Sequence, residues 1–121
     1  MASKKIVSRR KAAEISLKLK RSDKKVGFTS GSFDLIHAGH VDYLRKAKEK
    51  CDILFVGLNS DSSVRKYKGD QRPIIPLKQR MEIISSLESV DYVFPFNERR
   101  NRKNIEAIRP DYYIKAGDYK P

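Results

Sequence analysis

The sequence predicts an α/β domain built around a parallel sheet. From Lys25 onward, short runs rich in β-branched and aromatic residues alternate with helical patterns, which is typical of parallel βα units. The run from Asp52 to Leu58 is a continuous apolar strand of the kind that is buried on both faces. A length of 121 residues is close to that of one domain.

The individual elements follow from local patterns. An amphipathic helix is expected within the first 25 residues, with Ser8 as N-cap and with Ala12, Ile15 and Leu19 on one face. The later elements are a strand at Val26 to Thr29, a helix at Val41 to Lys50, the strand at Asp52 to Leu58, an extended segment fixed by Pro73 and Pro76, a helix with Leu77, Met81, Ile84 and Leu87 on one side, a strand at Tyr92 to Phe96, a short helix carrying Ile105 and Ile108, and a strand at Tyr112 to Ala116.

The net charge of +12 is unevenly distributed. Residues 1–25 hold ten Lys and Arg against two acidic residues, whereas residues 26–121 hold seventeen against thirteen. The chain is therefore divided into a basic N-terminal helical segment, 1–25, and a mildly basic domain, 26–121. We interpret the segment as a solvated helix docked by a narrow apolar stripe, and a nucleic-acid-binding arm is the alternative.

Composition and patterning narrow the class of protein. Hydrophobic residues make up 39% and charged residues 35% of the chain, a balance within the globular range. No long apolar run and no signal-peptide pattern is present, so we expect a cytoplasmic protein without a membrane partner. Cys51 has no second cysteine with which to form an intramolecular disulfide and no zinc-site spacing.

The candidate site is the loop from Ser30 to His40, which follows the first strand. In open parallel sheets, ligands bind beyond the carboxyl ends of the strands. Both histidines of the chain, His37 and His40, lie three positions apart at the mouth of a helix, so their rings should point to the same side. Gly31 and Gly39 allow close approach of backbone, and the helix N-terminus favours phosphate. The loop therefore predicts a triphosphate site.

The histidine pair also allows two other interpretations. One histidine could cap the helix or pack in the interior, which is the usual role of a lone histidine. The pair could also bind a metal, but only Asp34 lies nearby as a third ligand. We therefore expect no protein-bound metal; magnesium would arrive with the triphosphate.

The motifs resemble those of a known superfamily. The stretch Gly31-Ser32-Phe33-Asp34 followed by His37-Ala38-Gly39-His40 is similar to the G-x-F-D and H-x-G-H signatures of cytidylyltransferase-like nucleotidyltransferases, over residues 26–119. Within that superfamily, FTSGSFDLIHAGHVDYL, VGLNSDSSVRKYKGDQRPI, PLKQR and DYYIKAGDY most resemble the adenylyltransferase domain of ADP-heptose synthesis. Glycerol-3-phosphate cytidylyltransferases resemble the first motif but fit less well after Asn59.

The resemblance implies a Rossmann-like three-layer α/β sandwich and assigns site residues. His37 and His40 would be catalytic, holding the triphosphate and stabilising the transition state. Nucleotide contacts are expected from Thr29, Ser30, Gly31, Phe33, Asp34, Gly39, Lys66, Lys68 and Asp118, and substrate contacts from Asn59, Asp61 and Arg80.

The reasons for these secondary assignments differ. Lys66 and Lys68 are expected in a charged loop that ends at a glycine and folds over the phosphates, although such a run is often a solvated face. Arg80 is expected to reach a phosphate or to lie at the surface or an interface. Asp34 is expected to orient the loop by local hydrogen bonds, and Asp118 resembles the acid of the family that faces the base or ribose.

The chain departs from the family pattern in three places. Ser30-Gly31-Ser32 stands where relatives usually have Asn-Gly-Cys, and Lys115-Ala116-Gly117-Asp118-Tyr119 where they have Lys-Gly-Gly-Asp-Tyr. The relatives continue to a Ser/Thr-rich loop that clamps the triphosphate, whereas no serine or threonine follows Ser89 here. A C-terminally shortened domain is therefore expected.

The sequence thus predicts an enzyme that transfers AMP from ATP to a sugar phosphate such as heptose 1-phosphate and releases pyrophosphate. A cytidylyltransferase that uses CTP with glycerol 3-phosphate or a similar substrate is the alternative. A catalytically silent α/β domain with a nucleic-acid-binding arm is the alternative from another class, but nucleic acid is not the expected partner, because residues 26–43 contain no Lys or Arg. A homodimer is left open.

Overall fold

A four-stranded parallel sheet organises residues 3–115, the part of the chain that the computed structural model describes. Its strands are β1 (Val26–Gly31), β2 (Ile53–Asn59), β3 (Tyr92–Phe96) and β4 (Tyr112–Tyr113), in the order β3-β2-β1-β4. Phe28 of β1 is in register with Phe55 of β2, and Gly57 of β2 with Phe94 of β3. The parallel α/β class is therefore confirmed.

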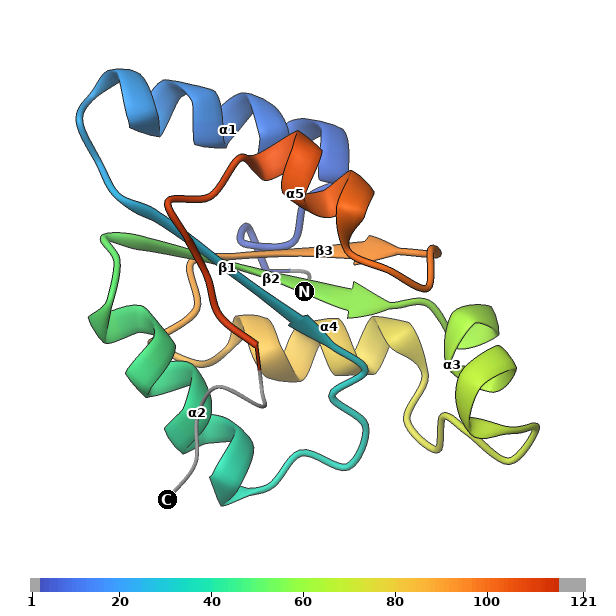
Figure 1. The fold of residues 1–121 in the computed structure, drawn as a ribbon. Coiled ribbons are helices and arrows are strands. Elements are labelled where there is room, and N and C mark those ends of the chain that lie inside the picture. Colours follow the sequence, from blue (N-terminus) through green and yellow to red (C-terminus); the bar gives the residue numbers. More distant parts are fainter. Residues whose placement is uncertain (1–2, 116–121) are drawn as a thin grey trace.

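Helices cover both faces of this sheet, as Figure 1 shows. The helices α1 (Arg9–Arg21) and α5 (Arg102–Ile108) lie on one face, and α2 (Ala38–Glu49) and α4 (Leu77–Ser85) lie on the other. The short helix α3 (Asp61–Lys68) lies beyond the carboxyl end of β2. This arrangement confirms the predicted three-layer sandwich.

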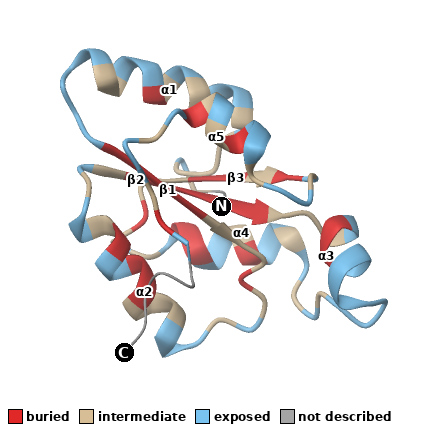
Figure 2. Ribbon diagram, in the orientation of Figure 1, coloured by how far each residue is buried: buried red, intermediate tan, exposed pale blue. Residues whose placement is uncertain are grey.

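The core is divided by the sheet into two apolar clusters, and β2 contributes to both. Leu54, Val56 and Leu58 pack toward α2 and α4, whereas Phe55 packs with the residues beneath α1 and α5. All four side chains are fully buried, as the red strands in Figure 2 illustrate. This two-sided burial explains why the sequence of β2 is continuously apolar rather than alternating.

The basic N-terminal segment packs directly on the sheet. Ile6 forms a parallel bridge with Val93 at the β3 edge, and Ser8 caps α1 by accepting a hydrogen bond from Lys11 N at 3.1 Å. Ala12 is fully buried in the cluster beneath α1 and α5. Ser16 Oγ donates to the carbonyl of Ile108 at 2.6 Å. The apolar docking of this helix is thus confirmed, and the segment shares the core of the domain.

Several element boundaries differ from the prediction. The strand β1 continues through Gly31, and α2 begins at Ala38, so the irregular loop between them is shorter than expected. The helix α4 ends at Ser85, before Leu87. The last strand covers only Tyr112–Tyr113, and its predicted end at Ala116 lies outside the described residues.

The helix α3 was missed, because Asp61–Lys68 shows no apolar periodicity: only Ser63 and Val64 are buried. The sequence nevertheless contains the signals of a helix start at Ser60 and Asp61. Ser60 is the N-cap and accepts from Ser63 N at 3.3 Å, and Asp61 lies in the first turn, where the helix dipole favours an acid. None of the helices formed by residues 3–115 has the length and apolar character needed to cross a bilayer.

Candidate active site

The two histidines lie side by side at the start of α2. His37 is the N-cap of the helix and His40 is in its first turn, and their ring centroids are 4.1 Å apart. The shared orientation predicted from their spacing is confirmed. The side chain of His37 is exposed, and that of His40 is half-buried against Phe33, with ring centroids 5.7 Å apart.

Both imidazoles accept a main-chain hydrogen bond at Nδ1. The N–H of Gly39 donates to His37 Nδ1 at 3.0 Å, and the N–H of His37 donates to His40 Nδ1 at 3.1 Å. A ring nitrogen that accepts carries no proton, so each neutral imidazole has its proton on Nε2 and can donate there. Helix capping and donation to a ligand are compatible, because they use different ring nitrogens.

The environment keeps His40 neutral. Burial lowers the pKa of His40 below its usual value of 6.5, and the neighbouring charges of His37 and Lys68 lower it further. A neutral imidazole preserves the Nδ1 acceptor that the N–H of His37 requires. The hydrogen-bond geometry and the pKa therefore favour the same protonation state.

The histidines line a pocket of about 450 Å³, a volume within the range of small-molecule sites. Its lining consists of Ser30, Gly31, Ser32, Phe33, His37, Gly39, His40, Tyr43 and Lys68. None of these described residues is a carboxylate, while Lys68 and the N-terminus of α2 supply positive potential. A second hollow, of about 290 Å³ between α1 and α5, is lined mainly by alkyl groups. The first pocket is the one suited to an anionic ligand.

The loop that leads to the histidines has unusual backbone geometry. Phe33 and Leu35 adopt positive φ angles of 51° and 52°. Residues other than Gly, Asn and Asp seldom adopt this backbone conformation. The Phe33 ring lies so close to Gly31 that a Cβ there would be 3.1 Å from the ring. Gly31 is therefore needed for close approach of the aromatic ring, and backbone strain is concentrated beside the candidate site.

Asp34 lies between the two strained residues and fixes the loop to a distant segment. Its carboxylate accepts hydrogen bonds from the N–H groups of Ile74 and Ile75 at 2.8 and 2.9 Å. Burial alone would raise the pKa of Asp34, but these hydrogen bonds, with the charges of Arg72 and Arg80, hold that pKa below its usual value. The expected orienting role is present, but the partners are remote in sequence rather than local.

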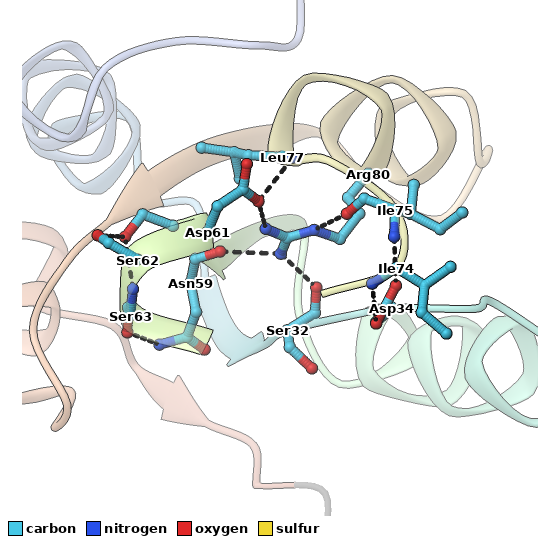
Figure 3. A network of polar contacts seen from close by, with 11 residues as sticks. Ser32, Asp34, Asn59, Asp61, Ser62, Ser63, Ile74, Ile75, Leu77 and Arg80 are labelled. Carbon is cyan, nitrogen blue, oxygen red and sulfur yellow. Dashed lines mark hydrogen bonds and ion pairs between the residues drawn. The ribbon is translucent and has the colours of Figure 1, made fainter. Parts of the chain in front are cut away.

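Arg80 is fully buried, so its interpretation as a surface or interface residue is wrong. Figure 3 shows its guanidinium between the ends of β1, β2 and α4, where it meets the carboxylate of Asp61 at 2.6 Å. The carbonyl of Asn59 also accepts from Arg80, at 2.8 Å, and the Asn59 amide donates to Ser63 Oγ at 3.2 Å. The structure thus brings Asn59, Asp61 and Arg80 together at the carboxyl end of β2, and the substrate contact expected of them stays a prediction.

The two lysines lie on a helix, so the predicted loop is wrong. Lys68 ends α3, and its ammonium donates to Ser32 Oγ at 3.0 Å. Gly69 follows with a φ of 99° and ends the helix. The sequence had predicted that a glycine ends this segment, but the segment is a helix and not a loop. Lys66 is exposed on the same helix and does not line the pocket.

Two further predictions concern Thr29 and Asp118. Thr29 is fully buried, and its hydroxyl is hydrogen-bonded to Tyr43 rather than facing the cavity. Tyr43 was assigned only to the core face of its helix, yet it lines the pocket and donates to the carbonyl of Ile114 at 3.1 Å. Its position three residues after His40, one helical turn further on, was the available signal. Asp118 lies outside the described residues.

The pocket chemistry suits phosphate rather than a bare cation. Within residues 3–115, no group of three or more His, Cys, Asp or Glu side chains is arranged to hold a metal ion. Both oxygens of Asp34 already accept main-chain hydrogen bonds. The imidazole N–H groups and the Lys68 ammonium would repel a divalent ion but attract the oxygens of its phosphate complex.

The sequence of this chain is similar to those of known proteins. The family model described as cytidylyltransferase-like matches residues 28–120. The bifunctional protein HldE of Nitratiruptor sp. is 50% identical over 106 residues, which cover 88% of this chain and 23% of that protein. The bifunctional protein HldE of Wolinella succinogenes is 47% identical over 118 residues, covering 98% and 25%. The chain thus spans about a quarter of the length of these curated relatives.

Solved structures show the same fold. The lipopolysaccharide core biosynthesis protein of Thermoplasma volcanium is 30% identical with a TM-score of 0.67, and the match covers 74% of this chain and 72% of that one. Pantoate-beta-alanine ligase from Francisella tularensis is 27% identical with a TM-score of 0.57, covering 88% and 38%. The first match extends over most of both chains.

Proposed function

The chain belongs to the cytidylyltransferase-like family, and we propose that it is a nucleotidyltransferase that transfers AMP from ATP to a sugar phosphate and releases pyrophosphate. The observation that supports this most strongly is the pair of imidazoles whose Nε2 atoms are left as donors at the pocket. Two preorganised N–H donors beside an ammonium suit a group whose oxygens gain charge during reaction.

In the proposed reaction, a phosphate oxygen of the acceptor attacks the α-phosphorus of ATP. A new P–O bond forms as the bond from the α-phosphorus to the bridging oxygen breaks, and pyrophosphate leaves with that electron pair. The attacking oxygen is ionised at neutral pH, so no general base is required. His37 and His40 donate from Nε2 to the oxygens that gain charge, and Lys68 adds positive charge nearby.

Magnesium enters this reaction with the triphosphate and neutralises part of its charge. The residues of the pocket fit the phosphate oxygens of that complex, as their donor chemistry indicates. Gly31 and Gly39 leave the backbone accessible beside the histidines. The protein's own contribution is therefore positioning and electrostatic stabilisation.

The choice of substrate rests on resemblance. The segments around Asn59 and Lys115 resemble those of heptose-type adenylyltransferases more than those of cytidylyltransferases. The solved relative from Thermoplasma volcanium is a lipopolysaccharide core biosynthesis protein. We therefore propose heptose 1-phosphate as the acceptor and ATP as the donor.

A pyrophosphate assay over a matrix of substrates tests this proposal. The protein is incubated with magnesium, with ATP or CTP, and with heptose 1-phosphate or glycerol 3-phosphate. We expect pyrophosphate release with ATP and heptose 1-phosphate, and calorimetric binding of ATP that exceeds that of CTP. Release with CTP and glycerol 3-phosphate would instead identify a cytidylyltransferase. No release and no binding of either nucleotide would overturn the enzymatic proposal.

A further inference from the structure

We propose that Arg80 is a positioning residue for catalysis, which holds the segment carrying the two histidines in its active geometry without touching the substrate. This inference rests on the proposed function, because it assigns a role within the same reaction. Arg80 lies on α4 and does not line the pocket, although it contacts Ser32, which does.

The guanidinium of Arg80 donates to four residues from three separate stretches of the chain. Nη1 donates to the carbonyl of Ser32, after β1, at 2.7 Å and to that of Asn59, at the end of β2, at 2.8 Å. Nε donates to the carbonyl of Ile75 at 2.8 Å, and Nη2 donates to the carboxylate of Asp61 at 2.6 Å. One planar group therefore fixes the relative positions of the segments that surround the carboxyl end of the sheet.

Burial makes this arrangement costly unless every partner is in place. The side chain of Arg80 has no exposed surface, and a cation removed from water is tolerated only when it is paired and hydrogen-bonded. Asp61 supplies the compensating charge, and its carboxylate also accepts from Leu77 N at 2.9 Å. An apolar side chain would fill the same space without that requirement, so the polar contacts indicate a positional role.

Asp34 holds the same segment as Arg80, because both side chains bind the main chain of Ile75. It binds the N–H of Ile75, while Arg80 binds the carbonyl of the same residue. Ser32, which Arg80 binds, precedes Phe33, and Asp34, which binds Ile75, follows it. The left-handed backbone of Phe33 is therefore held in place by both of its neighbours in the chain. Such a conformation costs on the order of 1–3 kcal/mol and persists only where its surroundings hold it.

The held segment leads directly to the catalytic pair. His37 follows Asp34 by three residues, and the Phe33 ring packs against the ring of His40. Any shift of Phe33 is therefore transmitted to His40. Because displacement of a catalytic group by about 1 Å can reduce a rate on the order of a hundredfold, loss of this support should affect turnover more than binding.

The test compares Arg80→Lys with the control Lys78→Ala, an exposed cation two positions earlier on the same helix. Lysine keeps the charge but cannot reach all four partners. We expect kcat to fall about tenfold to a hundredfold, with KM for ATP changed by less than about threefold. The control should keep both values. Asp61→Asn, which keeps an oxygen acceptor but removes the charge, should produce the same pattern and decides the question if Arg80→Lys does not fold.

A second readout does not depend on activity. Amide hydrogen exchange should accelerate by about tenfold or more at Ile74 and Ile75 in Arg80→Lys, while exchange at Phe55 in β2 stays at the parent rate. Unchanged kcat in a folded variant, or equal acceleration at all three amides, would overturn the positioning role. If the parent releases no pyrophosphate, the proposed function fails, but the exchange pattern still reports whether Arg80 holds this segment.

Discussion

The main-chain N–H of His37 donates to Nδ1 of His40 at 3.1 Å, so the two histidines are held together by the backbone as well as by ring contact. This hydrogen bond requires an unprotonated Nδ1 on His40. It therefore ties the protonation state of one imidazole to the geometry of the other. The consequences can be measured by titration.

The first prediction concerns the pKa of His40. Because burial and neighbouring charge lower it, His40 should titrate below 6.5. Its contribution to stability is then fully present above pH 6.5 and is lost as the pH falls through the lowered folded value. NMR titration of the histidine Cε1–H signals measures the midpoint directly. In His37→Asn the midpoint should rise, since the His37 charge is removed; a parent midpoint at or above 6.5 would contradict the assigned hydrogen bond.

The second prediction separates stability from activity at Gly39. A Cβ at this position would lie 2.7 Å from Cε1 and 3.0 Å from Nδ1 of His37, so Gly39→Ala should displace that ring. Alanine also favours the helix by about 0.5–1 kcal/mol relative to glycine. We expect pyrophosphate release to fall about tenfold or more, while the melting temperature changes little, because loss of the His37 cap offsets the gain in helix propensity. Parent activity in this variant would show that the His37 ring position does not matter.

The third prediction tests close packing between β1 and Cys51, which lies two residues before β2. A Cβ at Gly27 would lie 2.6 Å from Sγ of Cys51, a half-buried thiol whose pKa burial raises to about 11. Gly27→Ala should therefore destabilise the fold by about 1–3 kcal/mol. Cys51→Ala removes the sulfur and should relieve part of this penalty. Urea unfolding of both single variants and the double variant gives the coupling free energy between Gly27→Ala and Cys51→Ala. Strictly additive changes in the free energy of unfolding would contradict the contact.

The fourth prediction concerns the attachment of the basic N-terminal helix. Arg9 donates to the two oxygens of Glu98 at 2.7 and 3.1 Å, and this hydrogen bonding lowers the pKa of Glu98 to about 2 from 4.5. The stabilisation is therefore complete above pH 4.5 and is lost as the pH falls through about 2. Glu98→Gln should cost about 1 kcal/mol at pH 7, with a smaller cost at pH 3.

Its matched control is Glu106→Gln, which removes an exposed acid paired with Arg102 on α5. Because that pair is well exposed, we expect little change in stability at either pH. Equal effects of the two substitutions in denaturant titrations would indicate that the Arg9 contact adds nothing to the docking of the helix.

The sequence allowed the histidine pair to be located, because its chemistry is local. A strand, a glycine turn and two histidines three positions apart define a site within one short stretch. Buried strands such as β2 were equally accessible, since continuous apolar runs are caused by burial on both faces. Predictions succeeded where the determining residues are neighbours in the chain.

The role of Arg80 could not be predicted in the same way. Its partners Ser32 and Asn59 are 48 and 21 positions away, and both contribute backbone carbonyls that any residue type would supply. Asp34 likewise binds main-chain N–H groups 40 and 41 positions away. Side-chain contacts to remote backbone leave no pattern in the sequence, so these partners could not be identified from it.

The measurement that tests the central claim most directly is pyrophosphate release by His37→Asn beside the parent protein, with ATP, magnesium and heptose 1-phosphate. Asparagine is a favourable N-cap, so it can replace the contact with Gly39 N while removing the Nε2 donor. We expect parent-like thermal stability and a loss of about a hundredfold or more in turnover, as for the removal of one preorganised donor. A folded His37→Asn variant that turns over at the parent rate would contradict the account.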